Sequence, residues 1–278
     1  MVEFIDPYWE KEYAENLKLS ILLGVDSFSF SVMNHKNVIL AFREYDWDIV
    51  QYQSASEILS LASKIMEDSI FKGTYNAVSY QIIPGQFTFL PHRLFDKNKL
   101  AIYFEHLTGE EDVNDIKFTE IGDLDLMVIY KENLFQKNLS QILYPERPFM
   151  PIFKSILPFL KNQDIYDTHL FCRISKNSLV LFVYRDKFLL FANQFYCYQI
   201  SDFQYFILLT CNQFQLNPSH ETLYLWGDCD EDSEVLKELN SLFSKVRFLN
   251  AQWIISPDTK TRILPEAKVL EHLLIYSR

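Results

Sequence analysis

One order of secondary-structure signals occurs twice in this chain, about 150 residues apart, and this repeat limits the possible folds more than any other feature. In each copy, three apolar runs with the spacing of β-strands precede a helix signal and a fourth strand. The predicted strands of the first copy are Leu17–Leu23, Phe28–Met33, Val38–Tyr45 and Tyr75–Ile83. Those of the second copy are Thr168–Ile174, Leu179–Tyr184, Phe188–Tyr198 and Thr222–Trp226. The copies share this pattern and almost no residues, so the repeat indicates tandem domains of one fold.

The helix signals follow the same order in both copies. The spacings Ser54 to Glu57 and Ser201 to Gln204 each predict a capping box, in which two side chains satisfy free amides at a helix start. After the fourth strand each copy continues with a helix, a strand and a helix. These elements are Asp96–Leu107, Asp125–Tyr130 and Glu132–Leu143, then Glu231–Phe243, Val246–Leu249 and Pro265–Tyr276. We expect an α/β protein with the order β-β-β-α-β-α-β-α twice, residues 1–148 forming one domain and residues 149–278 the other.

The alternation of phenylalanine and serine in Phe28–Met33 predicts a half-buried strand. Before the second copy, Tyr144–Pro151 contains three prolines and precedes a helix-like segment, Ile152–Leu160, which together suggest a hinge.

This order of elements resembles the ribonuclease H-like domain, and two such domains in tandem resemble the actin-like ATPase fold. Leu223–Asp228, followed by an acidic helix start, resembles the adenosine-loop segment of that family. Asp125–Leu160 resembles the strand, helix and interdomain helix of the pilus-assembly actin-like proteins. The runs SFSFSV after a VDS turn, FTFLP and HRLFD are similar to a Bacteroidota family of unknown function with a degenerate actin-like fold.

The resemblance implies that two hairpin turns and the adenosine loop would hold a nucleotide. Active members carry an Asp for the magnesium water shell and glycines that let amides approach phosphates. The first turn, Gly24–Ser27, keeps an Asp but has no following glycine, and the second, Ser175–Ser178, has neither. The candidate nucleotide-contacting residues are therefore Asp26, Ser27, Lys176, Asn177, Gly227 and Asp228. The structural alternative makes Asp26 a turn residue that caps local amides, and Gly227 a backbone turn that ends a strand.

Other chemistries find little support in the sequence. A two-metal nuclease needs acids on strands one and four, and neither Leu17–Leu23 nor Ala77–Ile83 contains one. The acids between Asp228 and Glu234 lack the glycine of a calcium loop and are typical of a helix N-terminus. The six histidines have no metal spacing, and surface or turn positions suit most of them. We assign no catalytic residue, metal ligand or cofactor, and only 6 glycines in 278 residues also disfavour a phosphate loop.

The charge balance limits the possible partners. With 26 basic and 37 acidic side chains the net charge is −11, which disfavours nucleic acid. No polybasic run or signal peptide is present, and charged residues interrupt the most apolar region, Ser178–Ile200, so we expect no membrane insertion. The four cysteines, without CxxC spacing, suggest reduced core thiols and a cytoplasmic protein.

The favoured hypothesis is a non-catalytic actin-like protein, a pseudo-ATPase that serves as a protein-binding or assembly module for an unidentified partner. The acidic segment Glu105–Asp125 is a candidate partner surface, and a solvated loop is its alternative. The alternative function is a nucleotide-binding regulatory protein with an altered interdomain cleft, so nucleotide binding is possible but disfavoured. A hydrolase or transferase has no group of residues behind it.

Overall fold

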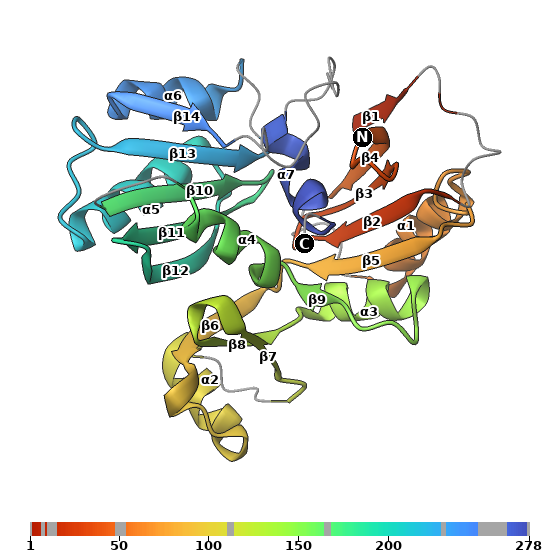
Figure 1. Ribbon diagram of the computed structural model, residues 1–278, viewed down its shortest axis with the longest axis horizontal. Coiled ribbons are helices and arrows are strands. Elements are labelled where there is room, and N and C mark those ends of the chain that lie inside the picture. The colour runs from red at the N-terminus through yellow and green to blue at the C-terminus, as the bar shows by residue number, and fades with distance from the viewer. Residues whose placement is uncertain are drawn as a thin grey trace. The chain divides into compact units, whose positions relative to one another are not determined.

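A computed structural model describes residues 2–6, 9, 16–47, 54–109, 114–163, 168–228, 232–249 and 266–276. These residues form two compact units with separate β-sheets (Figure 1). Unit 1 contains the described residues up to Ile156 and those from Glu271 onward, and unit 2 contains those from Leu157 to Leu270. Two helices, α4 (Phe153–Lys161) and α7 (Glu266–Leu274), contribute residues to both units.

The main sheet of unit 1 has six strands in the order β1-β4-β3-β2-β5-β9. The strands are β1 (Val2–Ile5), β2 (Lys18–Leu23), β3 (Ser27–Met33), β4 (Ile39–Asp46), β5 (Ala77–Ile82) and β9 (Met150–Pro151). β2, β3 and β4 form the predicted antiparallel meander, and β5 runs parallel to β2. The Asn34 side chain makes the turn between β3 and β4, since its Oδ1 accepts from the backbone N–H of Lys36 and Val38 (2.9 and 3.0 Å).

Both faces of β3 are buried, so the prediction of a half-buried strand at this position is wrong. All seven residues of β3 are buried. Phe28 and Phe30 pack against Phe71, with ring centroids 5.9 and 5.5 Å apart. The serines alternate with these rings and lie on the opposite face, where Ser29 lies within hydrogen-bond distance of His272 of α7. Small serine side chains thus leave room for a helix and supply polar partners for it.

The predicted strand at 125–130 exists as β8 (Leu126–Lys131), but it does not join the main sheet. It lies between β6 (Gln86–Pro91) and β7 (Lys117–Ile121) in a separate three-stranded antiparallel sheet. The place beside β5 belongs to β9, two residues long. β8 joins this second sheet because β6 and β7 offer it a complete hydrogen-bonded ladder on each side. The sequence interpretation missed both of these strands.

Besides the first part of α4, unit 1 contains further helices. α1 (Ala55–Glu67) begins at the predicted capping box of Ser54 and Glu57, and it packs against α3 (Leu134–Leu143). α2 (Leu100–Thr108) lies beside β6, and the last part of α7 contacts the main sheet. The predicted helices of the first copy therefore all exist, with starts that move by a few residues.

Unit 2 contains one mixed sheet in the order β12-β11-β10-β13-β14. The strands are β10 (Thr168–Ile174), β11 (Ser178–Arg185), β12 (Phe188–Tyr196), β13 (Thr222–Gly227) and β14 (Lys245–Phe248). The first three are antiparallel, as the resemblance to a ribonuclease H-like domain implies, and β13 runs parallel to β10. Buried Leu, Ile, Val and Cys side chains of one sheet face form the core together with α5 (Ile200–Gln213) and α6 (Glu234–Leu242).

The predicted start of α5 is wrong by two residues. The N-cap is Gln199 and the N3 residue is Asp202, where the sequence suggested Ser201 and Gln204. The Asp202 carboxylate accepts from the backbone N–H of Tyr198 (2.8 Å) and Gln199 (3.1 Å), and a carboxylate is a stronger acceptor than a serine hydroxyl. These hydrogen bonds lower the pKa of Asp202, the one to Tyr198 most.

Three cysteines, Cys172, Cys197 and Cys211, are buried, as predicted, while Cys229 lies outside the described residues. Burial raises the pKa of the Cys211 thiol to about 11. No helix among the described residues is long and apolar enough to cross a membrane.

Candidate nucleotide-binding turns

The first candidate turn, Gly24–Ser27, joins β2 to β3 in unit 1, and all four of its residues are buried. The Gly24 N–H donates to the Ser27 carbonyl oxygen (2.8 Å) and closes the turn. The buried Trp47 covers this turn. The Trp47 indole N–H donates to the Val25 carbonyl oxygen, and the Trp47 backbone N–H donates to the Asp26 carbonyl oxygen (both 3.0 Å). A bound phosphate needs exposed backbone N–H groups, and this turn instead lies beneath an aromatic side chain of its own chain.

Gln136, which the sequence interpretation missed, closes the same turn from the start of α3. Its Nε2 donates to the carbonyl oxygens of Gly24 (2.9 Å) and Ile83 (2.7 Å). Its Oε1 accepts from the backbone N–H of Gly85 (3.2 Å) and Asn133 (3.1 Å). The side chain is fully buried and its donors and acceptor are all used. The spacing of Asn133 and Gln136 is a capping box and could have drawn attention to this residue.

The second candidate turn, Ser175–Ser178, joins β10 to β11 in unit 2 and is less enclosed. The Ser175 N–H donates to the Ser178 carbonyl oxygen (2.9 Å), so the turn closes in the same way as the first. The Asn177 carbonyl oxygen accepts from the Cys197 N–H (2.8 Å). Lys176 is exposed and Asn177 is half-buried. The turn therefore keeps one cationic side chain at the surface.

Gly227 ends β13 beside that turn, and its backbone strongly disfavours any residue with a Cβ. Its φ is +95°, and a Cβ would lie 2.2 Å from the Ile174 carbonyl oxygen. The next N–H, that of Asp228, donates to the same oxygen (2.8 Å). Because β10 and β13 are parallel, their carboxyl ends bring Lys176, Asn177, Gly227 and Asp228 to one edge of the sheet.

An ion pair engages the Asp228 carboxylate. Lys268 Nζ lies 2.6 Å from its Oδ1, and the Lys268 side chain is only 7% exposed, against 40% for Asp228. The charge that the sequence places at this loop is therefore balanced by a lysine 40 positions away. No local pattern could have predicted this partner.

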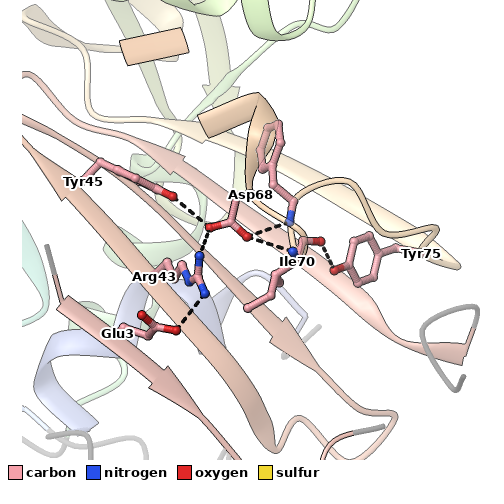
Figure 2. Close-up of polar contacts among 7 residues, drawn as sticks. Glu3, Arg43, Tyr45, Asp68, Ile70 and Tyr75 are labelled. Atoms are coloured by element: carbon pink, nitrogen blue, oxygen red, sulfur yellow. Dashed lines mark hydrogen bonds and ion pairs between the residues drawn. The ribbon is translucent and has the colours of Figure 1, made fainter. Parts of the chain in front are cut away.

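A further polar cluster in unit 1 surrounds Asp68, the C-cap residue of α1 (Figure 2). Its Oδ1 accepts from the backbone N–H of Ile70 (2.8 Å), and its Oδ2 accepts from the Tyr45 hydroxyl (2.8 Å) and from the Arg43 guanidinium. Arg43 also pairs with Glu3 on β1 (2.7 Å). Burial, and then the hydrogen bond to Asp68 and its charge, raise the pKa of Tyr45 to about 12. Because the Asp68 side chain is fully buried, this cluster fastens α1 to the sheet and offers no site to a substrate.

His272 on α7 lies between two serines, an arrangement that superficially suggests nucleophilic catalysis. Nδ1 lies 2.8 Å from the Ser20 hydroxyl and Nε2 lies 2.9 Å from the Ser29 hydroxyl. All three side chains are buried, so His272 is not one of the histidines that suit a surface or turn position. A nucleophile must reach its substrate, so these contacts hold α7 on the sheet. Among the described residues, no three His, Cys, Asp or Glu side chains are grouped to hold a metal ion.

Residues 7–246 match the family model described as "Protein of unknown function (DUF3822)". The chain belongs to the DUF3822 family. A search of the curated proteins finds no match to it. Among solved structures, this DUF3822 chain is similar to a Bacteroides thetaiotaomicron VPI-5482 protein described as having an actin-like ATPase fold and unknown function. The identity is 20% and the TM-score 0.69, over 87% of this chain and 93% of that one.

The DUF3822 chain is also similar to a chain of the PilM–PilN type IV pilus biogenesis complex, with 12% identity and a TM-score of 0.60 over 92% of this chain and 97% of that chain. At such identities the similarity establishes the fold alone. The chain therefore has the actin-like ATPase fold, as the order of its elements predicts.

Proposed function

We propose that this DUF3822 chain is a non-catalytic actin-like protein that acts as a protein-binding or assembly module. The observation that carries this proposal is the closed first turn. Its two central carbonyl groups bond to Trp47, its Gly24 carbonyl bonds to Gln136, and its residues are buried. A nucleotide could reach the turn only after these contacts opened, at the cost of several buried hydrogen bonds.

The second group of candidates supports the same proposal. At Gly227 the glycine is explained by the contact with Ile174, and at Asp228 the carboxylate is engaged by Lys268. Both residues thus have structural roles that need no ligand. We infer that Asp26, Ser27, Lys176 and Asn177 likewise act as turn residues in this chain.

The protein-binding part of the proposal draws on a fold relative. The PilM–PilN complex contains an actin-like chain that associates with another protein, and we propose that this chain also has a protein partner. The acidic segment Glu105–Asp125 is one candidate surface, with residues 110–113 outside the described residues. In its described part, Asp115 pairs with Lys137 (2.5 Å), so some of its charge is already balanced. We place the protein in the cytoplasm, because buried cysteine thiols suit a reducing compartment.

A hydrolysis assay tests the absence of catalysis. We expect release of phosphate from ATP with magnesium at the rate of a buffer blank, for the wild-type chain and for Asp26→Ala alike. A wild-type rate clearly above the blank that Asp26→Ala abolishes would contradict the proposal. A rate that survives the substitution would be assigned to a contaminating enzyme.

A further inference from the structure

A small, half-open pocket lies in unit 2, away from the candidate nucleotide turn that follows β10. It is bounded by the end of α4, the amino-terminal half of β10 and the end of β11, and its described lining residues all belong to unit 2. The pocket encloses about 210 Å³, including the space at its mouth. Drug-sized ligands occupy pockets of roughly 300 to 1,000 Å³, so this one suits only a small ligand or the end of a chain.

One part of the pocket lining is apolar and aromatic. Leu160, Phe171 and Tyr184 line the pocket and are 2%, 1% and 4% exposed. The rings of Phe171 and Tyr184 meet edge to face, with centroids 5.8 Å apart. The Tyr184 hydroxyl donates to the Leu157 carbonyl oxygen (3.1 Å), so its proton is already used within the protein. These side chains therefore offer apolar contact to a ligand.

The other part of the lining is basic. Lys161 at the end of α4, Lys187 in the hairpin between β11 and β12, and the imidazole of His169 all line the pocket. None of the described residues that line it is an aspartate or a glutamate. This contrasts with the chain as a whole, which has a net charge of −11. Two ammonium groups beside apolar walls attract an anion more strongly than the same groups on an open surface.

Lys187 adopts a backbone conformation that is rare for lysine. Asp186 and Lys187 form the two-residue turn of the hairpin, with φ of +49° and +68°. Turns of this kind favour glycine at the second position, because a side chain there is strained. Of these two turn residues, Lys187 lines the pocket and Asp186 does not. The chain thus carries a lysine beside the pocket where glycine would fit the turn better.

We propose that this pocket binds a carboxylate on a short apolar stem. The ammonium groups of Lys161 and Lys187 pair with the carboxylate, and Phe171 and Tyr184 contact the stem. A phosphate dianion fits less well, because it needs more hydrogen-bond donors and loses more hydration beside apolar walls. The carboxylate belongs either to a free small acid or to the end of a peptide chain. This site goes beyond the proposed function, since it does not depend on whether the chain binds or hydrolyses nucleotides.

Titration of the full chain with phenylacetate, followed by ligand-observed NMR, tests this inference. We expect saturable binding that is about 10-fold tighter than that of the neutral phenylacetamide or of inorganic phosphate. In Lys187→Gly the affinity for phenylacetate should fall about 10-fold, because one charge-assisted contact is lost. The urea midpoint of the same variant should stay unchanged or rise, since glycine adopts a positive φ without strain. The control is Lys237→Gln, an exposed lysine of α6, which should bind phenylacetate as the wild type does.

A short peptide that ends in a free phenylalanine carboxylate, compared with its amide, distinguishes the two sources of the carboxylate. Tighter binding of the peptide than of phenylacetate assigns the pocket to a chain end, and the reverse assigns it to a free acid. The inference is overturned if neither acid binds, if the amides or phosphate bind as tightly, or if Lys187→Gly binds unchanged. A fall in the urea midpoint of Lys187→Gly would also contradict it, because the lysine would then serve the turn itself. The proposed function survives each of these results, since it depends on the nucleotide assays.

Discussion

The two units of this protein start from the same arrangement of strands and close it in different ways. In unit 1 the turn between β2 and β3 is buried beneath Trp47 and bonded to Gln136. In unit 2 the corresponding turn between β10 and β11 leaves Lys176 exposed, and its neighbour Gly227 is fixed by a backbone contact. Each unit thus satisfies its turn with groups of its own, although the residues differ entirely.

The main sheets of the two units also differ in the strand that follows the fourth one. The fifth strand of unit 2, β14, extends the sheet through four parallel pairs, while unit 1 has only the two residues of β9 there and uses β8 elsewhere. In unit 1, one face of the sheet carries serines that lie within hydrogen-bond distance of His272. In unit 2, the corresponding face of β11 carries Phe182 and Tyr184 instead. One order of elements is thus compatible with very different interiors, so a shared fold does not carry a shared site.

The largest effect should come from Gly227→Ala. The new Cβ would collide with the Ile174 carbonyl oxygen in a backbone conformation that alanine rarely adopts, so we expect a loss of about 4 kcal/mol in the free energy of unfolding, measured in urea. Gly109→Ala is the matched control, since it also has a positive φ (+71°) but no atom within 4 Å, and should cost about 1 kcal/mol. Equal losses would show that the contact in unit 2 is not a structural requirement.

In unit 1, Gln136→Ala should lower the free energy of unfolding by about 3 kcal/mol, because the buried carbonyls of Gly24 and Ile83 lose their donor. Gln141→Ala on the same helix replaces an exposed glutamine and should change it by less than about 0.5 kcal/mol. Urea midpoints of the two variants measure the difference. A Gln136→Ala variant as stable as the control would mean that the turn does not depend on this side chain.

The contacts of His272 with Ser20 and Ser29 in unit 1 predict an intermediate loss of stability. His272→Leu should cost about 2 kcal/mol, because the hydroxyls of Ser20 and Ser29 lose a buried partner. His106→Leu, an exposed histidine on α2, is the control and should be close to neutral. If the two substitutions shift the thermal midpoint equally, the histidine does not fasten α7 to the sheet.

The smallest effect concerns alkaline pH and the Asp68 cluster. Because the folded protein raises the pKa of Tyr45 to about 12, it holds the phenol proton more tightly than the unfolded chain, where tyrosine titrates near 10. This contribution is complete below pH ~10 and is lost as the pH rises toward ~12. Unfolding measured at several pH values in that range should therefore show a shallower decline for Tyr45→Phe than for the wild type. Parallel declines for the two proteins would contradict the role given to Tyr45. Because the pKa of Tyr130 is also raised, the quantity to compare is the difference in stability between wild type and Tyr45→Phe at each pH.

Local patterns predicted the first three strands of each copy, the fourth strands and most helices, since alternation and capping signals depend on near neighbours. They did not predict that β8 lies outside the main sheet, because an apolar run fits either sheet and the available neighbouring strands determine which sheet it joins. They also could not show that the serines of β3 are buried, because that depends on a helix about 240 positions away. The candidate residues lie at the two hairpin turns and at the end of β13, but the side chains that bond to these segments, Gln136 and Lys268, come from elsewhere in the sequence.

Isothermal titration calorimetry with ATP and with ADP, each with and without magnesium, tests most directly whether the first turn is closed to nucleotides. We expect no binding heat at high protein concentration and no shift in melting temperature, since a ligand that binds the folded state raises that temperature. Saturable binding in the micromolar range, weakened by Asp26→Ala, would contradict it. That result would mean that Trp47 and Gln136 yield to the ligand, and would favour a nucleotide-controlled regulatory protein.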